Sequence, residues 1–101
     1  MTPALEELLG LDPASPALLR AQLLADNDRA LLSALVAIRK ERGLAQAQVG
    51  ELMGVSQPSV ADFEAHDANP TLSRIRRYAH AVRAHVVHKV EADEGQLLDD
   101  A

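Results

Sequence analysis

Apolar side chains recur at helical spacing through the middle of the chain. Leu31, Leu35 and Ile38 follow one another at intervals of four and three residues, which predicts a helix over residues 29–42 with Gly43 as its C-terminal stop. The same kind of spacing predicts further helices over residues 46–53, 57–65 and 72–82.

The N-terminal region is predicted to be helical as well. Leucines indicate a weak helix over residues 3–9, and a segment with two prolines then breaks the chain. Ser15 and Pro16 suit the start of the next helix, as a capping residue and a first-turn proline. The acidic run before residue 29 lies within one long helix or begins a new one. We favour a new start near Asp28.

The C-terminal region alternates between apolar and polar residues over 84–90, which favours a short strand, although the preceding helix continuing through it is the alternative. Residues 91–101 are an acidic tail. The expected organisation is an N-terminal helical extension (1–27), a central helical domain (28–83), and a strand, expected to pair with that of a second copy, with the tail (84–101).

Composition narrows the class of protein. A chain of 101 residues, 48% of them hydrophobic, has room for a single modest core. It contains no cysteine, which excludes thiol chemistry and fits a cytoplasmic location. It shows neither a membrane-spanning apolar run nor the pattern of a signal peptide.

The net charge of −5 is unevenly distributed. Residues 1–27 carry −3 and residues 91–101 carry −5, whereas residues 28–90 carry +3. The basic excess therefore coincides with the central helical domain, as a phosphate-binding surface requires.

Two short predicted helices flank a tight turn at Gly54, Val55 and Ser56, which makes the central domain (28–83) a helix-turn-helix. This arrangement suits the major groove of DNA, which admits one α-helix. The chain resembles the Cro/repressor-type helix-turn-helix family, also called XRE, over about residues 31–90. The resemblance implies an all-α, repressor-like five-helix DNA-binding domain, to which this chain adds an N-terminal helix and a short C-terminal strand. The matching residues are Arg39, Gly43, Leu44, Gln46, Leu52, Gly54, Val55, Ser56, Gln57, Val60, Glu64, Pro70, Thr71, Leu72, Arg77, Tyr78 and Ala79.

The resemblance assigns structural roles to several positions. It implies that Arg39 pairs with Glu64, fixes the angle between two helices and turns an N–H towards a phosphate. Gly43 and Gly54 end helices. Gly50 stands where the family has a small residue, and we expect it to permit a close approach between the backbones of two crossing helices.

Candidate DNA contacts cluster at the start of the second motif helix. Gln57, Pro58 and Ser59 are expected to reach base edges, because a glutamine amide can pair with adenine and a proline offers carbon to a thymine methyl. Ser56 is expected to cap this helix. The resemblance implies that Gln46 bonds a phosphate and can touch the base contact made by the second motif helix.

Charged residues near this helix are candidates for further contacts. Asp62 stands where the family usually has a polar or basic residue, so it reads a cytosine, pairs with an arginine or faces away. Arg74 and Arg77 are candidate phosphate ligands. Ala45 departs from the usual Ser or Thr helix cap.

No catalytic residue, cofactor site or metal site is predicted. The sequence has no nucleophile turn and no glycine-rich phosphate loop, and its four histidines are not joined by an acid in a convincing ligand set. The protein is therefore not expected to be an enzyme.

The sequence predicts a sequence-specific DNA-binding transcriptional regulator, a repressor that acts as a homodimer. The alternative is an antitoxin similar to the HigA type, which would bind a toxin protein and its own operator; the Ile75-to-Ala79 run resembles those antitoxins. A third class would use the same fold for protein contacts alone.

Overall fold

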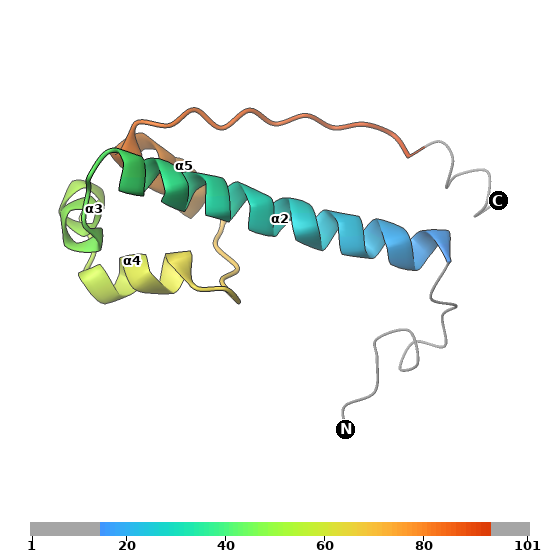
Figure 1. Cartoon of the computed structure of the whole chain (residues 1–101), viewed down its shortest axis with the longest axis horizontal. Coiled ribbons are helices and arrows are strands. Elements are labelled where there is room, and N and C mark those ends of the chain that lie inside the picture. The colour runs from blue at the N-terminus through green and yellow to red at the C-terminus, as the bar shows by residue number, and fades with distance from the viewer. Residues whose placement is uncertain (1–14, 94–101) are drawn as a thin grey trace, which may run out of the picture. The chain divides into compact units, whose positions relative to one another are not determined.

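The computed structural model describes residues 15–93, which form four α-helices (Figure 1). The all-α class is confirmed. The helix predicted over residues 3–9 lies outside the described residues, as does the tail from residue 94. The helices are α2 (Pro16–Glu41), α3 (Gln46–Met53), α4 (Gln57–Glu64) and α5 (Leu72–Val82).

Helix α2 begins where the sequence predicts but is longer than expected. The Ser15 hydroxyl accepts a hydrogen bond from the Leu18 N–H at 3.1 Å, as a helix cap does. The prediction of a new start near Asp28 is wrong, because the helix continues to Glu41. No glycine or proline interrupts residues 17–42, and the low helix propensity of Asp and Asn costs only a few tenths of a kcal/mol, roughly, per residue.

Three helices end in the same left-handed turn. Gly43, Gly54 and Arg83 have φ values of 69°, 71° and 62°. In each case the N–H of this residue and that of the next return to carbonyls of the last helical turn. Arg83 therefore holds a conformation that usually belongs to glycine.

By its internal contacts the chain divides into residues 29–88 and a second unit of residues 1–28 and 89–101. The first unit holds the main core, in which Val49, Val60 and Val82 are almost completely buried. The rings of Phe63 and Tyr78 stack there with centroids 4.3 Å apart. This core joins the turn motif to α5.

The strand predicted over residues 84–90 does not form in the described chain, where residues 84–93 contain neither helix nor strand. Its alternation has a different cause: Ala84 and Val86 pack against the core, while His85 and Val87 are exposed. A strand also needs a neighbouring strand for its ladder, and residues 15–93 provide none. Over this same range, no helix is long and apolar enough to cross a membrane.

Candidate nucleic-acid interface

The turn between α3 and α4 passes directly over Gly50. A Cβ at this position would lie 2.7 Å from the Val55 carbonyl oxygen and 3.3 Å from the Ser56 carbonyl carbon. Gly50 thus faces the backbone of the turn, where the sequence led us to expect a crossing of two helices. The absence of a side chain lets the turn close tightly and brings α4 near α3.

Helix α4 has a polar, exposed first turn and a buried face that packs in the core. The Ser56 hydroxyl accepts from the Ser59 N–H at 3.2 Å, and Pro58 occupies the first turn, where its missing N–H costs nothing. Gln57 and Pro58 are exposed, whereas Val60 and Phe63 of the same helix are buried. The start of α4 is therefore displayed outward while its other face is fixed in the core.

The two glutamines of the motif are joined to a buried carboxylate. The Gln57 side-chain Nε2 donates to Gln46 Oε1 at 2.7 Å. Gln46 in turn donates its own Nε2 to Glu64 Oε1 at 3.0 Å. This chain of hydrogen bonds runs from the exposed start of α4, through the start of α3, to the end of α4.

Glu64 is the centre of a wider network. Arg39 forms a two-pronged contact with it, from Nε to Oε2 at 2.7 Å and from Nη2 to Oε1 at 2.9 Å. The Tyr78 hydroxyl donates to Oε2 at 2.7 Å. The Arg39 and Glu64 side chains are only 11% and 7% exposed. Arg39 also donates from Nη1 to the Leu44 carbonyl at 2.8 Å. Because Arg39 belongs to α2 and Tyr78 to α5, helices α2, α4 and α5 meet at the Glu64 carboxylate.

The network keeps Glu64 ionised. Burial alone would raise the pKa of its carboxyl, but the hydrogen bonds from Arg39, Gln46 and Tyr78 outweigh it and hold the pKa below the ordinary glutamate value. Burial, followed by the bond to Glu64, raises the pKa of Tyr78, so its hydroxyl stays protonated and can donate. Tyr78 belongs to the family pattern, but a sequence position does not reveal where its hydroxyl points.

The remaining charged candidates lie in different settings. Asp62 and Arg74 line a hollow of about 290 Å³ beside Ser59, and Asp62 forms no ion pair within residues 15–93. Arg77 instead donates from Nη2 to the Met53 carbonyl at 2.6 Å, which ties α5 to the last residue of α3. Arg77 thus has an identified partner within the protein.

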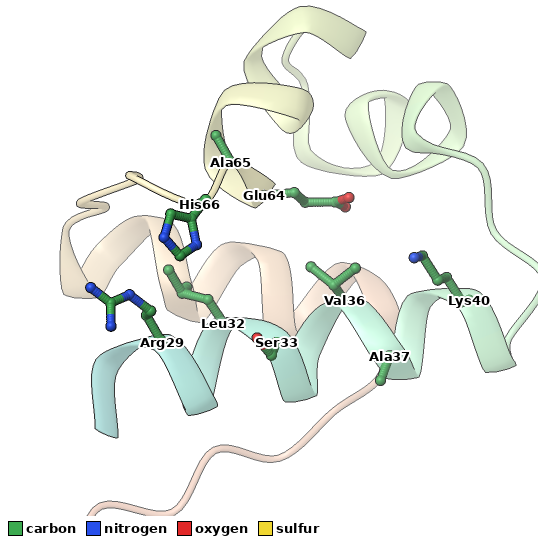
Figure 2. Close-up of a pocket in the computed structure, with 9 residues that line it drawn as sticks. All are labelled: Arg29, Leu32, Ser33, Val36, Ala37, Lys40, Glu64, Ala65 and His66. Atoms are coloured by element: carbon green, nitrogen blue, oxygen red, sulfur yellow. The ribbon is translucent and has the colours of Figure 1, made fainter. Parts of the chain in front are cut away.

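A second hollow, of about 340 Å³, separates α2 from the end of α4. Figure 2 shows the Glu64 side chain reaching into the space between these helices, with Lys40 on the α2 side. His66 lies at its other end, above Leu32. In the described chain, no three His, Asp or Glu side chains gather in a way that could hold a metal ion.

The fold and the displayed helix start define a DNA-binding helix-turn-helix domain. Residues 35–85 match the helix-turn-helix family, and since this is half of the chain, the protein belongs to that family. The resemblance to the XRE class and to HigA-type antitoxins is confirmed.

The chain is similar to antitoxin HigA1 of Mycobacterium tuberculosis, in strains CDC 1551 / Oshkosh and ATCC 25618 / H37Rv. The identity is 45% over 60 residues, which cover 59% of this chain and 40% of each relative. The match thus spans well under half the length of these relatives. No solved structure matches the chain significantly.

Proposed function

We propose that the protein binds double-stranded DNA at specific sequences and acts as a transcriptional repressor. The observation that carries this proposal is the exposed, polar start of α4, where Gln57 and Pro58 stand beyond a buried Val60. A helix displayed in this way can enter the major groove with its first residues against base edges. Ser59 and Asp62 extend the same reading surface.

The proposed grip on phosphate comes from neighbouring elements. Arg74 lies in the first turn of α5, where its N–H bonds the capping Thr71 hydroxyl at 3.1 Å. Gln46, Arg39 and Ser56 belong to the same surface by family resemblance. Arg77 and Arg39 are weaker candidates, because the guanidinium of Arg77 donates to the Met53 carbonyl and that of Arg39 donates to Glu64 and the Leu44 carbonyl.

The decisive experiment compares Gln57→Ala with Arg74→Ala on the protein's own upstream DNA and on a scrambled duplex. Loss of a bidentate base contact should remove about 1–3 kcal/mol of discrimination, so Gln57→Ala should weaken operator binding far more than scrambled binding. Arg74→Ala should weaken both and flatten the salt dependence, since a phosphate contact carries no sequence information. An operator-to-scrambled ratio unchanged by Gln57→Ala would contradict the assignment of α4.

Asp62→Asn separates two roles for the exposed carboxylate. If Asp62 only repels phosphate, the change should tighten binding to every sequence. If it accepts from a cytosine N4 amine, the change should reduce specificity for the operator instead. Fluorescence anisotropy at two salt concentrations measures both outcomes.

We also propose that the protein acts as a homodimer. One recognition helix reads only a few base pairs, and two copies would read half-sites about one helical turn apart. Light scattering at high protein concentration, with and without operator DNA, tests this directly. A monomer under both conditions would rule it out.

The second candidate function is an antitoxin that binds a toxin protein and represses its own operon. The similarity to antitoxin HigA1 favours it, although the match covers 40% of that protein. If the proposal is right, a neighbouring gene should encode a protein that arrests growth when expressed alone and is neutralised by co-expression of this chain. A neighbour that is harmless when expressed would leave the repressor function standing alone.

A further inference from the structure

The hydrogen-bond chain from Glu64 to Gln57 has a direction imposed by chemistry. An ionised carboxylate can only accept hydrogen bonds, whereas a glutamine amide carries both a donor group and an acceptor oxygen. Gln46 must therefore turn its Nε2 towards Glu64, as the 3.0 Å contact shows. Its Oε1 is then left for Gln57, which must turn its own Nε2 inward, and this contact is 2.7 Å long.

This direction determines what Gln57 presents outward. One of its two Nε2 hydrogens is engaged by Gln46, which leaves one N–H donor and the acceptor Oε1. In the major groove, adenine offers the N6 donor beside the N7 acceptor, while guanine offers two acceptors, O6 and N7. The available pair on Gln57 is complementary to adenine, and its oxygen would face O6 of guanine unfavourably. An unrestrained amide could instead offer both hydrogens to guanine.

The carboxylate that imposes this direction is held in place by its neighbours. The Glu64 side chain is 7% exposed and is held by Arg39 and Tyr78, so it cannot turn to offer a different group. Gln57 is exposed and would be free to rotate without the contact to Gln46. The restraint therefore passes from the buried end of the chain to the exposed end.

We propose that Glu64 is a positioning residue for DNA specificity: acting through Gln46, it fixes the polarity of the Gln57 amide and makes that position select adenine over guanine. This proposal rests on the proposed DNA-binding function and adds a determinant that touches no base. The resemblance already implies that Gln46 supports the base contact of Gln57, and the new element is the carboxylate of Glu64, which gives that support its direction.

The test is to select DNA ligands from a randomised duplex pool with the full chain and to compare base preferences position by position. Gln46→Leu removes the link while leaving the contacts of Glu64 with Arg39 and Tyr78 in place. We expect the adenine-to-guanine preference at one position of each half-site to fall at least about fivefold, which corresponds to roughly 1 kcal/mol of lost discrimination. Arg74→Ala is the control, since loss of a phosphate contact should lower affinity without changing any base preference.

Glu64→Gln provides an independent variant. Its amide keeps the shape of the carboxylate but can donate or accept, so the direction of the chain is no longer imposed. We expect the same loss of adenine preference, with circular dichroism at low temperature verifying that the variant is folded. A wild type that selects adenine, with that preference unchanged in both variants, would overturn this proposal alone. A wild type that selects a different base there would also overturn it, and a wild type with no base preference would overturn the proposed function as well.

Discussion

At the scale of single residues, Gly50 stands where helix propensity alone favours alanine. Glycine costs about 1 kcal/mol relative to alanine inside a helix. The added Cβ, however, would lie 2.7 Å from the Val55 carbonyl oxygen, and a backbone atom cannot move aside as a flexible side chain can. The tight turn that holds α4 close to α3 therefore requires glycine at this position, despite its lower helix propensity.

We expect Gly50→Ala to lower the free energy of unfolding, because displacement of the turn outweighs the gain in propensity. Urea denaturation measures the change. Ser33→Ala, at an exposed position of α2, is the control and should raise stability by about 0.5 kcal/mol. A gain of about 1 kcal/mol in Gly50→Ala would show that the turn moves at little cost.

Arg83 is the opposite case, because it has a side chain at a position whose left-handed backbone conformation suits glycine better. Its φ of 62° and ψ of 49° are left-handed, which costs an ordinary residue about 1–2 kcal/mol. Arg83→Gly should raise stability by up to about 1 kcal/mol, since the greater freedom of glycine in the unfolded chain offsets part of the relief. The bond from Arg42 goes to the Arg83 carbonyl and survives the change. A lower melting temperature would mean that the arginine side chain makes a compensating contribution.

At the scale of elements, the sequence predicts best where a helix end depends on local chemistry. Ser56 and Thr71 cap their helices, and Gly54 ends α3, so α3 and α5 have the predicted bounds and α4 ends within one residue of them. The two wrong predictions concern segments that lack such signals. Asp28 can cap a helix or lie within one, and the residues alone do not decide. At 84–90, only Ala84 and Val86 pack on the core and residues 87–90 are exposed, and only the tertiary structure distinguishes this arrangement from a sheet.

Helix α3 has a half-formed cap that a single substitution should complete. Ala45 has the extended conformation of a capping residue, and the Gln48 side chain already accepts from its N–H at 2.8 Å. A methyl group cannot accept the reciprocal bond, so Ala45→Ser should raise stability by about 0.5–2 kcal/mol. Ala47→Ser, inside the same helix, should lower it slightly. Equal effects of the two changes would contradict the role of the cap.

The Glu64 network should make stability depend on acidity. The pKa of Glu64 is lowered in the folded protein, so its contribution is present above the unfolded value of about 4.3 and is lost as the pH falls through the folded value. Glu64→Gln should be less stable than wild type at neutral pH, and the difference should shrink in acid. Glu51→Gln, at an exposed glutamate, is the control. A difference that stays constant from neutral pH to below the folded pKa would show that ionisation of Glu64 contributes nothing.

At the scale of the whole molecule, the family pattern predicts which residues lie near Glu64 but does not predict how their hydrogen bonds are connected. The family resemblance predicts that Arg39 and Glu64 meet, because both positions belong to its pattern. The connection of Gln57 to Glu64 through Gln46 depends on side-chain orientations at the starts of two helices. Orientations of this kind arise only when the turn over Gly50 has brought those helices together, so no linear spacing reveals them.

The uneven charge leads to a prediction about affinity for any DNA. Residues 28–90 carry +3, and the −5 of residues 91–101 opposes the approach of phosphate. Replacing Glu94, Asp99 and Asp100 with their amides changes the net charge from −5 to −2 without shortening the chain. We expect tighter binding to operator and scrambled DNA alike at low salt. At about 0.15 M salt, where the screening length is about 8 Å, the gain should largely disappear. Anisotropy titrations across salt concentrations measure this, and a gain confined to the operator would indicate that the tail acts on specific recognition instead of through its charge.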